Sequence, residues 1–90
     1  MYRIIPTARF RKDLKRAAKR GLPMEQLENV VDALSLGKTL APKYRDHAFT
    51  GNYTGYRECH IQPDWLLVYR IDEEILTLVL AYTGTHSDLF

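Results

Sequence analysis

The stretch YRECHIQPDWLLVYRIDEEILTLVLAY, residues 56–82, decides the fold of this chain. It contains three runs of apolar and β-branched residues, and turn-forming residues separate them. The runs predict strands over Tyr56 to Ile61, Trp65 to Ile71 and Ile75 to Tyr82, with turns at Pro63-Asp64 and Asp72-Glu73-Glu74. Connections this short join antiparallel neighbours, so the sequence predicts an antiparallel meander.

The alternation along the middle strand leaves the core side of this meander open. One face carries Trp65, Leu67, Tyr69 and Ile71, and the other carries Leu66, Val68 and Arg70. Both faces are apolar enough to lie against a core, so the pattern does not decide between them.

A short strand and two helices are predicted upstream of the meander. Residues 2–5 alternate polar and apolar side chains before Pro6 ends the strand. Thr7 is a candidate N-cap for a helix that ends at Gly21, and Pro23 lies early in a second helix that ends at Gly37. Apolar residues recur at helical spacing in both helices: Phe10, Leu14, Ala17 and Ala18, then Leu27, Val30, Val31 and Leu34. The two helices are expected to form an antiparallel hairpin.

Two further segments carry helix and strand breakers. Residues 38–53, with Pro42, Gly51 and Asn52, are predicted to be a long loop or a loop with a short strand. The tail, residues 83–90, is too polar and glycine-broken to extend the sheet. The predicted order is β-α-α-β-β-β, an α+β fold with the helical hairpin packed on one sheet face.

Length and composition are those of one small globular domain over residues 1–90. The chain has 90 residues, of which 46% are hydrophobic and 27% charged, enough apolar surface for one modest core. Its longest apolar run, near Ile75 to Ala81, is far too short to cross a membrane, and its start lacks the features of a secretory signal. Cys59 is the single cysteine, which fits a reducing compartment. We therefore expect a cytoplasmic protein.

Positive charge is concentrated at the N-terminal end. Residues 1–20 hold eight basic side chains against Asp13 alone, for a net +7, whereas the rest of the chain carries a net −5. Such a surface attracts a phosphate backbone or docks an acidic protein partner, and it is equally typical of a solvated helix face. Lys15, Arg16 and Lys19 are the candidates for contacts with RNA.

The three histidines all lie in the C-terminal half, at positions 47, 60 and 86. Asp64 follows His60 across a predicted turn, and loop tips and strand ends at one sheet edge can converge in space. A histidine pair can supply a base and an acid near neutral pH, which suits the cleavage of RNA through its 2′-hydroxyl. The aromatic residues nearby, Trp65 among them, are candidates for stacking on unpaired bases.

Two other chemistries compete for these residues. His60, Asp64 and His86 could share a zinc ion, although no paired-cysteine or HExxH motif accompanies them. Cys59 could act as a nucleophile, although a cysteine inside a strand is usually a small buried hydrophobe.

Three segments carry a resemblance to a known family. The strings YRDH (residues 44–47), GNYTGYRECHIQPDW (51–65) and TGTHSDLF (83–90) lie within residues 44–90, about half of the chain. In order and spacing they closely resemble the YafQ-type branch of the RelE/ParE superfamily of type II toxins. The first forty residues resemble that family only in pattern, as a short strand, a basic helix and a second helix.

This resemblance implies a RelE-like fold and a ribosome-dependent endoribonuclease that cuts translated mRNA in the A site of the 30S subunit. It implies neutralisation by a cognate antitoxin similar to DinJ or RelB, contact with operator DNA only through that antitoxin, and no metal or other cofactor. The family's acid–base and phosphate-handling positions match His47, His60, Asp64 and His86, and its terminal aromatic residue matches Phe90. His60, Asp64 and His86 are expected to divide the roles of base, acid and orienting group, while His47 reaches phosphate or leaving group from the loop.

The sequence departs from the family pattern at Tyr82, where members usually carry an Arg suited to the scissile phosphate. A phenol supplies neither a permanent charge nor a bidentate fork. Arg57, Arg70, Arg45 or a protonated histidine could compensate. Two alternatives therefore stay open: a catalytically weakened toxin that acts as an antitoxin-binding, operon-regulating module, and a gyrase inhibitor like the ParE branch.

Overall fold

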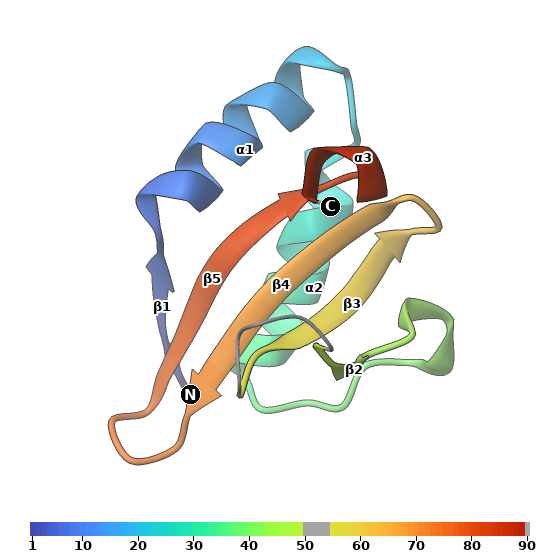
Figure 1. Ribbon diagram of the computed structural model, residues 1–90. Helices are drawn as coiled ribbons and strands as arrows, with labels where there is room; N and C mark the ends of the chain where they lie inside the picture. The colour runs from blue at the N-terminus through green and yellow to red at the C-terminus, as the bar shows by residue number, and fades with distance from the viewer. Residues whose placement is uncertain (50–54, 90) are drawn as a thin grey trace.

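The computed structural model describes residues 1–49 and 55–89. Its elements are β1 (Arg3–Pro6), α1 (Ala8–Lys19), α2 (Met24–Ser35), the 3-10 helix η1 (Pro42–Tyr44), β2 (His47–Ala48), β3 (Arg57–Gln62), β4 (Trp65–Asp72), β5 (Thr77–Gly84) and α3 (His86–Leu89) (Figure 1). The predicted α+β class and the C-terminal meander are confirmed. None of the described helices is long and apolar enough to cross a membrane.

The strands form one sheet in the order β1-β5-β4-β3-β2. Neighbouring strands are antiparallel except β1, which lies parallel to β5 at the edge of the sheet. Pro6 is the last residue of β1, an edge position that tolerates the missing N–H. The short strand expected within residues 38–53 is β2, although Gly51 and Asn52 lie outside the described residues.

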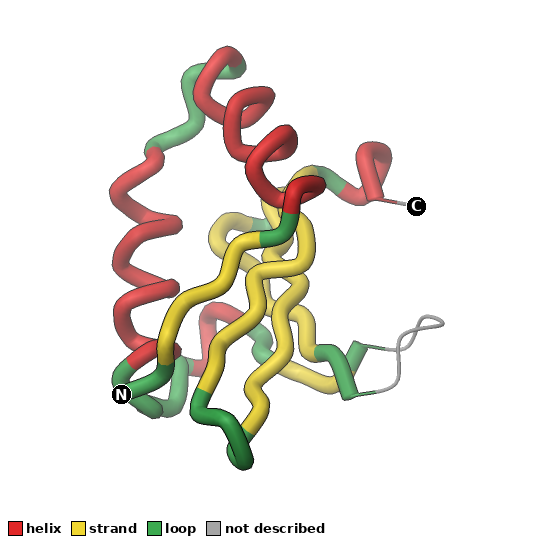
Figure 2. Tube along the Cα trace, turned by 90° about the vertical axis from the view of Figure 1, so that its left-hand side faces the viewer, coloured by secondary structure: helices red, strands yellow, loops and turns green. Residues whose placement is uncertain are grey.

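Both helices cover the same face of the sheet, as predicted. The core unites Phe10 and Ala17 of α1 with Leu27, Val30 and Leu34 of α2, and with the strand residues Cys59, Ile61, Trp65, Leu67, Tyr69, Leu78 and Leu80. In Figure 1, α1 rises from β1 and α2 returns downwards behind the sheet. Figure 2 shows α2 on one side of the sheet and α3, next to the C-terminus, on the other. The alternation of the sequence did not decide which face of β4 lies against the core. The structure shows that it is the face with Trp65, Leu67 and Tyr69.

The helix boundaries follow local chemistry. Thr7 caps α1, since its hydroxyl accepts a hydrogen bond from the Phe10 N–H at 3.0 Å. Gly21 and Gly37 follow the two helices with φ of +76°, a conformation that favours glycine and ends a helix. The second helix begins at Met24, after Pro23 as its N-cap, one residue later than the proline suggested.

Two boundaries of β5 differ from the prediction. The strand begins at Thr77 instead of Ile75, because the Asp72 carboxylate accepts hydrogen bonds from the Glu74 and Ile75 N–H groups and extends the turn. The strand also continues through Thr83 and Gly84, which the polar character of the tail argued against. Tertiary hydrogen bonds of Thr83, described next, keep these residues in the sheet.

Helix α1 closes the edge of β5 beyond the end of β1. The Thr7 N–H donates to the Leu80 carbonyl at 3.0 Å, and the Thr7 hydroxyl donates to the Ala81 carbonyl at 2.6 Å. The Asp13 carboxylate accepts the Thr83 N–H at 3.1 Å. Asp13 is buried, with its side chain 3% exposed, and lies 3.8 Å from Arg9 and 3.5 Å from Arg16. These contacts satisfy backbone groups that a neighbouring strand would otherwise bind.

We predict that Asp13→Ala lowers the free energy of unfolding by about 1–3 kcal/mol, since it leaves the buried Thr83 N–H unpaired. Asp13→Asn retains an acceptor and should cost less. Urea denaturation followed by circular dichroism measures both. Asp32→Ala, an exposed substitution on α2, should stay within about 0.5 kcal/mol of the parent; an Asp13→Ala midpoint equal to that of the control contradicts the role of Asp13.

Candidate active site

The three histidines converge in one row on the sheet face opposite α1 and α2. The ring centroids of His47 and His60 lie 6.2 Å apart, and those of His60 and His86 lie 6.0 Å apart. They come from β2, β3 and α3, which are distant in sequence. The expectation that these positions meet in space is confirmed, with His60 at the centre.

Asp64, in the turn between β3 and β4, orients His86. Its carboxylate lies 2.9 Å from His86 Nδ1 and also accepts the His86 backbone N–H at 3.2 Å. These two hydrogen bonds hold the pKa of the Asp64 carboxyl below its ordinary value, although the side chain is 69% exposed. The proton of His86 is thereby directed to Nδ1, and Nε2 is the nitrogen that can exchange a proton.

His60 is oriented by the backbone. Its Nδ1 lies 3.2 Å from the Pro63 carbonyl, which can only accept, so Nδ1 carries the proton in the neutral ring. Nε2 then holds the lone pair, and none of the described residues forms a hydrogen bond to it. This is the arrangement of a general base.

His47 contacts an acceptor at each ring nitrogen. Nδ1 lies 2.5 Å from the Arg45 carbonyl, and Nε2 lies 3.1 Å from the Glu58 carboxylate. A neutral ring satisfies one of these contacts and an imidazolium satisfies both. Because both ring nitrogens face protein acceptors, His47 is less suited than His60 to take a proton from a substrate. Glu58 escaped the sequence analysis because it meets His47 only through β2–β3 pairing.

Helix α3, which carries His86, packs tightly on the end of β5. A Cβ added at Gly84 would lie 2.9 Å from the Asp88 Cβ, so this position has room only for glycine. Asp88 accepts hydrogen bonds from Arg20 at 2.6 and 3.1 Å and lies 3.5 Å from Arg16. The Arg20 guanidinium and the Thr85 N–H hold the pKa of Asp88 far below its usual range. These contacts anchor α3 to α1 and balance part of the positive charge of α1.

The residues predicted to bind RNA do not form one surface in the structure. Lys15 and Lys19 are exposed on α1 and form no ion pair with the described residues, whereas Arg16 is paired with Asp13 and Asp88. Arg57 contacts Asp46 at 3.3 Å. The Arg70 guanidinium lies 5.7 Å from the centre of the Tyr56 ring, and its buried Nε has no hydrogen-bond partner among the described residues.

The prediction that Trp65 stacks on an RNA base is wrong. It is 1% exposed, and its indole N–H donates to the Thr83 hydroxyl at 3.0 Å. The ring lies in the core between the sheet and the helices, where no base can stack on it. The sequence suggested otherwise because Trp65 lies near the histidines along the chain, but the first residue of β4 points its side chain to the core face of the sheet. Phe90 lies outside the described residues.

Tyr82 lies under a cation that the sequence analysis overlooked. The Arg9 guanidinium is centred 4.3 Å from the Tyr82 ring, and Phe49 meets the same ring edge-on at 6.3 Å between centroids. Tyr82 is 7% exposed, while the Arg9 side chain is 50% exposed. Arg9 is distant in sequence from every histidine, so only the docking of α1 on β5 reveals it.

Cys59 is not available for nucleophilic chemistry. Burial raises the pKa of the Cys59 thiol to about 12, so Cys59 stays protonated at neutral pH and is no nucleophile. Within residues 1–49 and 55–89, no group of three or more His, Cys, Asp or Glu side chains could hold a metal ion. The site can offer a base at His60 and an oriented histidine at His86, with the His47 ring beside them.

Comparisons with known proteins identify the family of this chain. A family model described as the bacterial toxin of type II toxin-antitoxin system, YafQ, matches residues 2–90. This chain belongs to the YafQ family of type II toxins. The mRNA interferase toxin YafQ of Escherichia coli K12 is 35% identical over 85 residues, which cover 93% of this chain and 90% of that protein.

Solved structures of YafQ-like toxins share the RelE-like fold. A metal-bound toxin from Helicobacter pylori is 44% identical, with full coverage of both chains and a TM-score of 0.95. A toxin chain in the E. coli DinJ-YafQ toxin-antitoxin complex is 34% identical, with a TM-score of 0.90 over 99% of this chain and 97% of that one.

Proposed function

We propose that this YafQ-family member is an mRNA endonuclease that cuts translated message in the ribosomal A site by acid–base catalysis without a metal. The observation that carries the proposal is the row of His47, His60 and His86, with Asp64 behind His86. The E. coli relative named an mRNA interferase supports the reaction class, at 35% identity over most of the chain.

In the proposed reaction, His60 Nε2 takes the proton of the ribose 2′-hydroxyl. The 2′-oxygen attacks phosphorus and forms a 2′,3′-cyclic phosphate, while the bond to the 5′-oxygen breaks. A protonated His86, held by Asp64 through Nδ1, delivers its Nε2 proton to that leaving oxygen. His47, placed between the Arg45 carbonyl and Glu58, contributes positive charge to the crowded phosphate.

We propose that Arg9 supplies the cation for the scissile phosphate, which Tyr82 cannot supply. Family members usually carry Arg where this chain has Tyr82, and Arg9 places a guanidinium 4.3 Å from that ring. We infer that the charge reaches the phosphate from α1 instead of from β5. Its long, half-exposed side chain can move towards a bound anion.

The expected partners follow from the family. An antitoxin similar to DinJ is the proposed neutralising partner, as in the E. coli DinJ-YafQ complex, and operator DNA would be reached only through it. The exposed Lys15 and Lys19 on α1 are proposed to contact ribosomal RNA. We propose a cytoplasmic location, where ribosomes are available. A binding module without nuclease activity is the alternative that Tyr82 favours.

The proposal predicts cuts within codons of a short message in a purified translation system, only when ribosomes are present. His60→Ala should lower the cleavage rate by about 10²-fold or more, because it removes the general base. Lys38→Ala, an exposed change on the connector after α2, should keep the parent rate.

Sequencing of the product ends measures both position and extent of cleavage, and circular dichroism checks that each variant is folded. A folded parent that cuts nothing, or a His60→Ala variant as active as Lys38→Ala, would overturn the nuclease proposal in favour of the binding module.

If Arg9 supplies the cation, a guanidinium placed at position 82 should replace the one at position 9. Arg9→Ala should reduce cleavage by about 10²-fold, and Tyr82→Arg added to it should restore most of the rate, since the guanidinium returns from β5. Arg11→Ala removes an equal charge from the same helix and should change the rate little.

The single-turnover rate under saturating ribosomes is the readout for the exchange. Equal losses in Arg9→Ala and Arg11→Ala would mean that only the overall charge of α1 matters. A folded double variant that stays as slow as Arg9→Ala would also contradict the exchange.

A further inference from the structure

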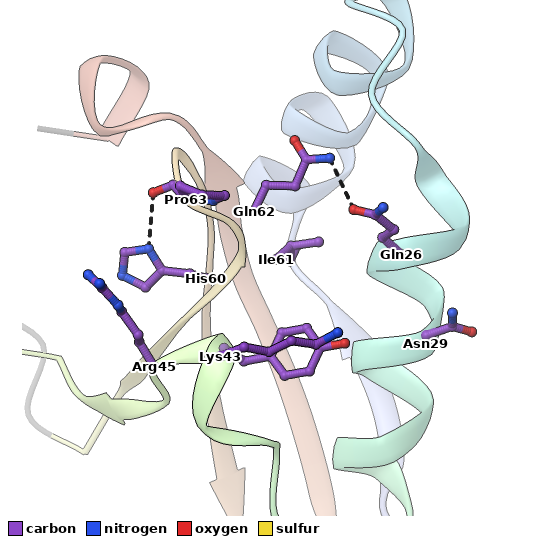
Figure 3. A pocket seen from close by; sticks show the side chains of 9 residues that line it. Gln26, Asn29, Lys43, Arg45, His60, Ile61, Gln62 and Pro63 are labelled. Carbon is purple, nitrogen blue, oxygen red and sulfur yellow. Dashed lines mark hydrogen bonds between the residues drawn. The ribbon is translucent and has the colours of Figure 1, made fainter.

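A cavity of about 560 Å³ opens beside His60, between α2, η1 and the end of β3 (Figure 3). Its size lies within the range of pockets that hold small organic ligands. Because His60 lines this cavity and also stands at the centre of the histidine row, the pocket and the proposed site of cleavage are continuous. The mechanism proposed above assigns no role to the rest of the pocket.

Two glutamines bridge the pocket between α2 and β3. Gln62 Nε2 donates to Gln26 Oε1 at 3.0 Å (Figure 3). This bond uses one donor and one acceptor, so the pair keeps one amide N–H₂ group and one carbonyl oxygen for a ligand. The same remainder results if both amides are turned over. Asn29, about one helical turn after Gln26, adds a second amide on the α2 side.

The other end of the pocket is basic. Arg45 has φ of +49°, a left-handed conformation that is uncommon for any residue other than glycine, and such strain is concentrated at functional sites. In this conformation its carbonyl accepts a hydrogen bond from His47 Nδ1, and its side chain lies at the same end of the pocket as His60 (Figure 3). Lys43 is the second cation of the lining, and Ile61 and Pro63 supply apolar wall.

We propose that this pocket binds the nucleotide next to the cleaved bond and selects its base. Every RNA base presents a donor next to an acceptor on its Watson–Crick edge, which complements the donor and acceptor left by the Gln26–Gln62 pair. The order of donor and acceptor is reversed between adenine or cytosine and guanine or uracil, so the order that the glutamine pair holds selects between these two classes of base. Arg45, whose side chain lies at the His60 end of the pocket, binds the adjoining phosphate (Figure 3), and the strained backbone at Arg45 couples this contact to His47. This inference rests on the proposed nuclease function, because it places RNA across His60.

Binding can be tested without cleavage. The four nucleoside 3′-monophosphates, titrated at millimolar concentration, should shift the side-chain amide NMR signals of Gln26, Gln62 and Asn29, and one base should bind more tightly than the others. Inorganic phosphate should not shift these amides. Shifts caused equally by phosphate alone, or an absence of shifts with all four nucleotides, overturn the pocket.

Selection of the base is tested by mapping cuts in a translated message. Gln26→Ala and Gln62→Ala should reduce the preference for the favoured base at one position beside the cut by about 2- to 10-fold, the effect of one lost hydrogen bond, while cutting at other sites persists. Glu25→Ala, on the same helix but outside the pocket, should keep the parent pattern.

An unchanged pattern in both glutamine variants, or a uniform loss at every site, overturns base selection. If the parent does not cut RNA at all, the nuclease proposal fails, and the nucleotide titration still decides whether the pocket binds a base.

Discussion

Thr83 is the junction on which the rest of the structure depends. Its N–H donates to the buried Asp13 carboxylate of α1, its hydroxyl donates to the Leu66 carbonyl of β4 at 2.5 Å, and the same hydroxyl accepts the Trp65 indole N–H. These bonds are shielded from water, where each is strengthened and where losing one partner is costly. Gly84 and α3 follow immediately, so the junction also sets the path of the chain to His86.

The docking of α1 at this junction leaves one face of the sheet to the core and the other to the histidine row. Helices α1 and α2 cover the face of Trp65 and Tyr69, while the opposite face carries the histidine row and Tyr82. The same docking of α1 takes Arg9 to the Tyr82 ring and pairs Arg16 and Arg20 with Asp88. The basic helix therefore has an internal role, and only part of its charge remains for an outside partner.

The sequence predicts the local features well. The helix caps at Thr7 and Gly21 and the meander strands follow from patterns within a few residues, and the meeting of the three histidines follows from strand ends and loops that share one sheet edge. What it cannot supply depends on long-range contacts: the core side of β4, the burial of Trp65 and Asp13, and the continuation of β5 through Thr83. Arg9 and Glu58 belong to the same class, since each joins the site only through tertiary pairing.

The reaction proposed for the histidine row is acid–base cleavage through the ribose 2′-hydroxyl. The most direct test is a translated message with a single 2′-deoxynucleotide at the position of the cut, compared with the all-ribose message under the same conditions. The deoxy substitution should abolish cutting at that position, and the ribose product should end in a 2′,3′-cyclic phosphate. Cutting of the deoxy message at the ribose rate would contradict it, because a nucleophile other than the 2′-oxygen would then attack the phosphate.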